Sequence, residues 1–68
     1  MSAYKIISVV GTSSKSWEDA AQSAVGAASK SLRDLRIAKV TEMDMTVDKK
    51  GKITQYRCKV EISFKYEL

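Results

Sequence analysis

The sequence lacks histidine and proline altogether, and it contains a single cysteine, Cys58. Without histidine, the usual Cys–His zinc sites are excluded and the most common general acid–base group is missing. With one cysteine, no disulfide can form within the chain. Because linker-like tracts and internal repeats are absent as well, residues 1–68 are predicted to form a single domain.

Recognisable catalytic motifs are also missing. There is no glycine-rich phosphate loop and no nucleophile elbow. Cys58 falls on the apolar side of an alternating segment, where a thiol is expected to be buried and inert. These absences predict a protein that is not an enzyme.

Long apolar runs are absent, which excludes a membrane-spanning helix. The N-terminal residues show no basic stretch followed by an apolar run and a cleavage site, so no secretory signal is expected. A single reduced thiol fits the cytosol. We therefore expect a cytoplasmic protein.

The chain is short for a self-sufficient core. A domain of about 60 residues buries roughly 60% of the surface that its unfolded chain exposes. Since a disulfide and the common zinc sites are excluded, self-association remains as the stabilising device. The sequence therefore predicts a homo-oligomer.

A strand, a helix and two further strands are expected in that order. Residues 4–10 are rich in β-branched side chains, and Gly11 is expected to close that strand. A helix is expected over 14–31, with Ser16 or Ser14 as its N-cap. Its apolar residues recur at three- and four-residue steps and form one stripe of mostly small side chains: Trp17, Ala20, Ala21, Ala24, Ala28 and Leu32.

The second half of the chain predicts a long β-hairpin. Residues 35–47 are typical of a strand, and their apolar positions change phase midway, which indicates either a bulge or burial of both faces by a neighbour. The turn over 48–51 contains Gly51, which supplies a positive φ angle. Residues 54–66 then alternate apolar and polar side chains without a break, so one face of that strand must be buried.

These elements predict an α+β fold of β-α-β-β order. Placing the third strand between the other two makes every neighbouring pair antiparallel and explains why the third strand alternates most cleanly. The expected sheet order is therefore 1-3-2. The helix then packs on one face of this three-stranded sheet, and the other face is free for another subunit.

Three stretches together resemble the dodecin family, and the likeness covers essentially the whole chain. They are Val10-Gly11-Thr12-Ser13 before an alanine-rich helix, Leu32-Arg33-Asp34-Leu35 before the second strand, and Val60-Glu61-Ile62-Ser63-Phe64-Lys65 in the third. The resemblance implies a hollow dodecamer built from trimers, in which the sheet wraps a short helix. It also implies storage or buffering of flavins such as FMN or riboflavin, without catalysis.

The flavin pocket of that family matches this chain poorly. Where flavin-binding dodecins have a stacking tryptophan, this sequence has Ile37, which offers no π-surface. Where they have a glutamine that bonds to the ring edge, it has Arg57, with Gln55 two residues earlier on the same face. Trp17 is expected to be a core anchor and no substitute. Because of this poor match, FMN or riboflavin is only the alternative to the ligand considered next.

Other stretches are similar to the calcium dodecins, a branch that implies calcium binding without flavin. These stretches are Ser16-Trp17-Glu18, Arg36-Ile37-Ala38-Lys39-Val40, Asp44-Met45, Val47-Asp48 and Gly51-Lys52-Ile53-Thr54. Calcium takes six to eight oxygen ligands, usually with several carboxylates among them. The resemblance therefore directs attention to the acidic residues of the hairpin.

Four carboxylates are the candidate calcium ligands. Glu42, Asp44 and Asp48 have even spacings, which place them on one face of a regular strand, and Glu61 on the third strand is a further candidate. Copies from neighbouring subunits would complete the coordination. The alternative is that these acids are solvent-facing charges or ion-pair partners of the nearby basic residues, which are Lys39, Arg57 and Lys59.

The net charge of +4 raises a further alternative, an anionic partner. Arg36, Arg57 and Lys59 are the candidate ligands for the phosphates of a nucleotide or coenzyme. Nucleic acid is disfavoured, because the basic residues do not form one stripe and no exposed aromatic pair is evident for base stacking.

Overall fold

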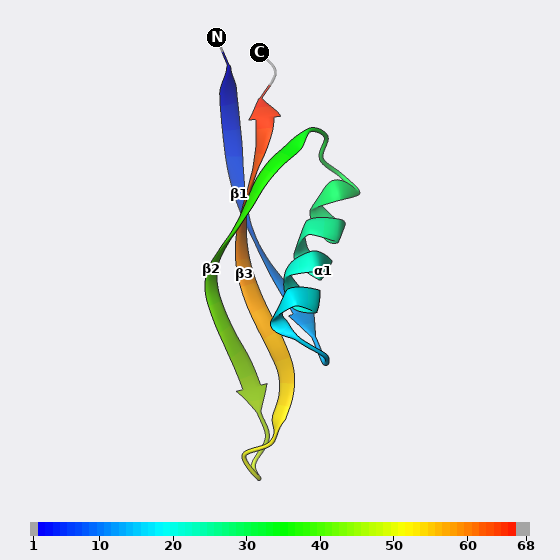
Figure 1. Cartoon of the computed structure of the whole chain (residues 1–68), viewed down its shortest axis with the longest axis vertical. Coiled ribbons are helices and arrows are strands. Elements are labelled where there is room, and N and C mark those ends of the chain that lie inside the picture. Colours follow the sequence, from blue (N-terminus) through cyan, green and yellow to red (C-terminus); the bar gives the residue numbers. More distant parts are fainter. Residues whose placement is uncertain (1, 67–68) are drawn as a thin grey trace.

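The computed structural model describes residues 2–66 and contains four regular elements. They are strand β1 (Ala3–Ser13), helix α1 (Trp17–Ser29), strand β2 (Leu35–Val47) and strand β3 (Ile53–Tyr66). The strands form one antiparallel sheet in the order β1-β3-β2, and α1 lies along one face of it (Figure 1). The expected β-α-β-β fold with a central third strand is confirmed.

The core lies between α1 and the central strand. The helix contributes its small side chains, and β3 contributes every second residue of its apolar face. The buried apolar residues are Ala20, Ala24, Ala28, Cys58, Val60 and Ile62. Cys58 Sγ donates to the carbonyl oxygen of Trp17 at 3.2 Å, so the thiol is buried, as expected. Trp17 itself is half-buried at the edge of this core.

The strand β1 is longer than predicted, because Gly11 does not end it. Gly11 pairs with Cys58 inside the sheet, and the strand continues to Ser13. A Cβ atom on Gly11 would come within 2.8 Å of the backbone nitrogen of Ala24 and would also meet the carbonyl of Ala20. The glycine therefore permits the close approach of α1 to the sheet, and its prediction as a strand end was wrong.

The helix is shorter than predicted at both ends. Its N-cap is Ser16, whose hydroxyl accepts a hydrogen bond from the backbone N–H of Asp19 at 3.0 Å. The cap is therefore Ser16 and not Ser14, and the helix begins at Trp17.

No helix within residues 2–66 is long and apolar enough to cross a membrane.

Irregularities in β2 account for the phase change of its apolar residues. The pairing register with β3 shifts between Leu35 and Ile37 and again between Val40 and Glu42. Each shift inserts one residue, so apolar residues with odd and even numbers reach the same face of the sheet. Of the two explanations that the sequence left open, the structure therefore shows the bulge.

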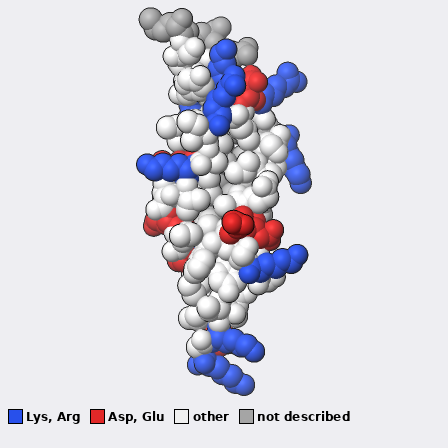
Figure 2. Space-filling view, viewed as in Figure 1, with Lys and Arg blue, Asp and Glu red and all other residues white. Residues whose placement is uncertain are grey.

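The β2–β3 hairpin extends beyond α1 and gives the molecule its elongated shape of 53 × 19 × 14 Å (Figure 1). Its turn is closed by Asp48, whose Oδ1 accepts from the backbone nitrogens of Lys50 at 2.8 Å and Lys52 at 3.0 Å. Gly51 has a φ of 79°, as expected for this turn. Basic side chains gather around the turn at this end of the molecule, and others lie toward the opposite end (Figure 2).

Candidate cation site on the open sheet face

Among residues 2–66, no element covers the sheet face opposite α1, and we call it the open face. Cross-strand pairs share a face, so the register assigns alternate residues of each strand to it. On β1 these include Ile6, Ser8 and Val10; on β2, Ile37, Lys39, Glu42 and Asp44; and on β3, Gln55, Arg57, Lys59, Glu61 and Ser63. Three of the four predicted calcium ligands, Glu42, Asp44 and Glu61, are therefore on this face, and Asp48 is not.

Asp44 and Arg57 form the shorter of the two ion pairs on the open face. The guanidinium donates from Nε to Oδ1 at 2.7 Å and from Nη2 to Oδ2 at 3.0 Å, so both carboxylate oxygens are engaged. This hydrogen bond, more than the charge of the guanidinium, holds the pKa of Asp44 below its usual value of 3.8. The same bond raises the pKa of Arg57. Bidentate pairing of this kind fixes orientation as well as distance.

A second, looser ion pair lies next to the first. Lys59 Nζ is 3.7 Å from Glu42 Oε2, and these two residues pair across β2 and β3. A small hollow is lined by these two side chains together with Asp44, Arg57 and Val10. Two carboxylates and two cationic groups therefore share one depression that is open to solvent.

The other two predicted metal ligands lie apart from this hollow. Glu61 pairs with Lys39 further along the open face and lines a separate hollow with Ile6, Ile37 and Ser63. Asp48 lies in the turn beyond β2, where its carboxylate is bonded to backbone N–H groups. Within residues 2–66 no three Asp, Glu, Cys or His side chains of one chain converge to hold a metal ion.

The residues at the positions of the family's flavin pocket are also placed by the sheet. The side chain of Ile37 is on the open face and strongly exposed, and its backbone bonds to the hydroxyl of Ser63. Gln55 pairs with Thr46 near the hairpin end. Arg57, at the position of the ring-binding glutamine, is engaged by Asp44. Residue 37 is isoleucine, so this position provides no aromatic ring that could stack on a flavin.

The three basic residues of the anion-binding alternative are not brought together. Arg57 and Lys59 are neighbours on the open face, but each faces a carboxylate of β2. Arg36 is the residue inserted at the first register shift of β2, eight positions from Asp44. At about 3.3 Å per residue, that spacing along the strand is about 26 Å.

Trp17 contacts the candidate site from the other side of the sheet. Its indole Nε1 donates to the carbonyl oxygen of Asp44 at 2.9 Å, and its ring meets Tyr56 edge-on with centroids 5.1 Å apart. The indole hydrogen bond holds the β2 backbone at Asp44, whose side chain faces Arg57 on the open face. Sequence reasoning identified Trp17 only as a core anchor, because no periodicity connects residues 27 positions apart.

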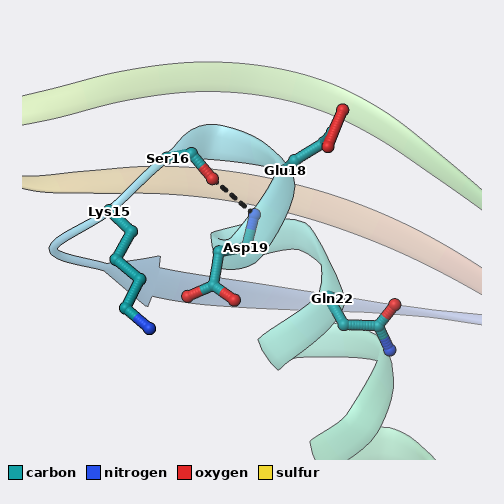
Figure 3. A pocket seen from close by; sticks show the side chains of 5 residues that line it. All are labelled: Lys15, Ser16, Glu18, Asp19 and Gln22. Carbon is teal, nitrogen blue, oxygen red and sulfur yellow. Dashed lines mark hydrogen bonds between the residues drawn. The ribbon is translucent and has the colours of Figure 1, made fainter.

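A wider depression at the start of α1 does not assemble a second acidic site. It is lined by Lys15, Ser16, Glu18, Asp19 and Gln22. Figure 3 shows the Glu18 and Asp19 side chains pointing away from each other. Asp19 Oδ2 accepts from the hydroxyl of Ser13 at 2.7 Å, so its carboxylate serves the helix start. The open face is therefore the better candidate for ion binding.

Known proteins resemble this chain over nearly its full length. The dodecin family model matches residues 3–67. A protein of Mycobacterium tuberculosis named calcium dodecin is 57% identical over 65 residues, which are 96% of this chain and 90% of that protein. The crystal structure of a calcium dodecin from the same organism, described as having a novel calcium-binding site, superposes with a TM-score of 0.84 at 52% identity, covering 96% and 91% of the two chains.

Structures from other bacteria share the fold as well. The tt0972 protein of Thermus thermophilus gives a TM-score of 0.91 at 34% identity, covering 100% of this chain and 98% of that one. A dodecin from Streptomyces coelicolor gives 0.92 at 28% identity, covering 98% and 94%. Family match, identity and fold agree, and the chain therefore belongs to the dodecin family.

Proposed function

We propose that this protein is a calcium-binding homo-oligomer without enzymatic activity, and that calcium binds on the open face at Glu42 and Asp44. One observation carries the proposal. These two carboxylates lie side by side, on a chain that is 57% identical to a protein named calcium dodecin. The remaining acids of the hairpin, Asp48 and Glu61, are secondary ligands that would come from neighbouring copies.

The chemistry of the two carboxylates suits a hard cation. Two ionised side chains offer four oxygens, and calcium takes six to eight. The missing ligands must come from water or from another subunit, because within residues 2–66 no third acidic side chain of the same chain joins the pair. In the assembled protein, a neighbouring subunit would supply the ligands that one chain lacks.

Exposed apolar residues on β2 support the homo-oligomer. The helix covers β1 and β3, and on the helix side of β2 the apolar side chains are left in solvent. Val40, Met43, Met45 and Val47 are all exposed, and Met43 reaches 60%. A contiguous apolar strip of this kind marks a protein–protein contact. A dodecamer built from trimers, as the family resemblance implies, is the proposed assembly.

Isothermal titration of chelator-treated protein with calcium tests the site. We expect the wild-type protein to bind calcium and the Glu42→Gln, Asp44→Asn double variant to lose most of that binding. Asp34→Asn is the matched control, since Asp34 is an exposed acid outside the site and its φ of 57° suits asparagine as well. Unchanged binding in the double variant would refute the site, and absence of wild-type binding would refute calcium.

Flavin binding is the competing function, and it predicts a different result. Equilibrium dialysis against riboflavin and FMN at micromolar protein should show no retained ligand, because Ile37 provides no stacking surface. Retention of either compound would favour the flavin alternative over calcium. Binding of a nucleotide or coenzyme can be measured in the same way.

A further inference from the structure

We infer that Arg57 is a built-in competitor for calcium, which weakens the affinity of the open-face site by holding Asp44. The inference rests on the proposed calcium site and adds the residue that regulates it. Arg57 stands where a metal ion must bind: its Nε and Nη2 lie 2.7 and 3.0 Å from the two oxygens of Asp44. Calcium needs those oxygens at about 2.3–2.6 Å. A calcium ion bound to both oxygens would take the in-plane position that the guanidinium now holds, so the two compete for bidentate binding by Asp44.

The charge balance of the hollow supports the same conclusion. Glu42 and Asp44 carry two negative charges, and Arg57 and Lys59 carry two positive charges beside them. The hollow is thus close to neutral and attracts a divalent cation weakly. Removing one positive charge leaves a net negative hollow.

The two ion pairs are not equivalent competitors. Lys59 meets Glu42 through one contact of 3.7 Å, whereas Arg57 meets Asp44 through two shorter hydrogen bonds. Glu42 is therefore the more accessible first ligand. Asp44 can bind calcium through both oxygens only when the guanidinium moves.

The structure also indicates which group moves. The backbone of Asp44 is held by the indole N–H of Trp17 on the opposite side of the sheet. The Arg57 side chain is 44% exposed and can swing into solvent. Exposed ion pairs are weak, so the exchange of Arg57 for calcium is accessible. Calcium binding therefore displaces a side chain and leaves the strand in place.

Calcium titrations of Arg57 variants test this inference. Arg57→Gln should lower the calcium dissociation constant by roughly two- to fivefold, because the competing charge and both hydrogen bonds are removed. Arg57→Lys keeps the charge but loses the bidentate geometry, and its affinity should lie between the two. Lys49→Gln, which removes one positive charge from the exposed turn of the same hairpin, should match the wild type.

The outcomes separate the inference from the proposed function. Wild-type binding with equal or weaker binding by Arg57→Gln overturns the role of Arg57 and leaves calcium binding intact. Absence of binding by both proteins overturns both. A crystal structure of the calcium-bound wild type gives a second readout: the Arg57 Nε–Asp44 Oδ1 distance must open beyond hydrogen-bonding range. A retained bond beside a bound ion contradicts the competition.

Discussion

At the scale of single residues, Gly11 shows how closely the helix and the sheet are packed. Its position in β1 faces the backbone of α1, and the nearest backbone atoms belong to Ala20 and Ala24. A helix with alanines at these positions can approach the sheet only if the strand presents no side chain there. Gly26 differs, since a Cβ on it would meet nothing within 4 Å.

Alanine substitutions at the two glycines should have opposite effects. Gly11→Ala should destabilise the protein by about 1–3 kcal/mol, because backbone atoms of α1 must move. Gly26→Ala should stabilise it by about 0.5–1 kcal/mol, because alanine is the better helix former. Denaturant unfolding at a fixed protein concentration measures both. A Gly11→Ala variant as stable as the wild type would show that the helix is not held at this distance.

Residue spacing predicted only part of the candidate site. Glu42 and Asp44 share the open face as expected, because β2 is regular between them. Asp48 does not continue the row, since β2 ends at Val47 and the turn that follows engages the Asp48 carboxylate. The sequence offers ion pairing with a nearby basic residue as an alternative for these acids, but which residue pairs with Asp44 depends on the cross-strand register.

At the scale of elements, the start of α1 is set by a cluster of hydroxyl groups. Ser16 caps the helix, and the hydroxyl of Ser13 accepts from the backbone nitrogen of Lys15 at 2.9 Å while donating to Asp19. Each bond satisfies a polar group that the helix or its loop would leave unpaired. The short loop from β1 to α1 is thereby held in one conformation.

Removal of the capping hydroxyl should weaken the helix start. Ser16→Ala should cost about 1 kcal/mol of stability, because the N–H of Asp19 loses its acceptor. Ser14→Ala is the control, since Ser14 is exposed and was the alternative cap. Thermal unfolding followed by circular dichroism compares them. A larger loss for Ser14→Ala than for Ser16→Ala would contradict the assigned cap.

The identity and order of the elements were predictable, whereas their ends were not. Unbroken alternation identified β3, and the change of phase indicated a bulge in β2 as one of two explanations. The strand end at Gly11 was mistaken because glycine serves both turns and close packing, and only tertiary contact distinguishes the two roles. The N-cap was also undecided from the sequence, because Ser14 and Ser16 can both accept a hydrogen bond at a helix start.

At the scale of the whole molecule, the single chain leaves two kinds of surface uncovered. One is the charged open face, and the other is the apolar strip of β2 beside α1. A helix of 13 residues is too short and too narrow to cover three strands of up to 14 residues. Assembly is therefore expected to cover what the helix does not.

A charge placed in the apolar strip should interfere with assembly. Met43→Glu would bury an unpaired carboxylate in any contact made by that strip, which is costly. We expect smaller species at concentrations where the wild type is fully assembled, as measured by sedimentation velocity. Ser23→Glu adds the same charge on an exposed helix position and should assemble normally. Wild-type sedimentation of Met43→Glu would place the interface elsewhere.

The bond from Trp17 to the backbone of Asp44 has a practical consequence. The chain contains one tryptophan, and its indole touches the strand that carries the two proposed calcium ligands. Its emission therefore comes from a single, defined environment directly behind the site, with Tyr56 beside it. The protein carries its own fluorescent reporter, so events on the open face can be followed optically without attaching a label.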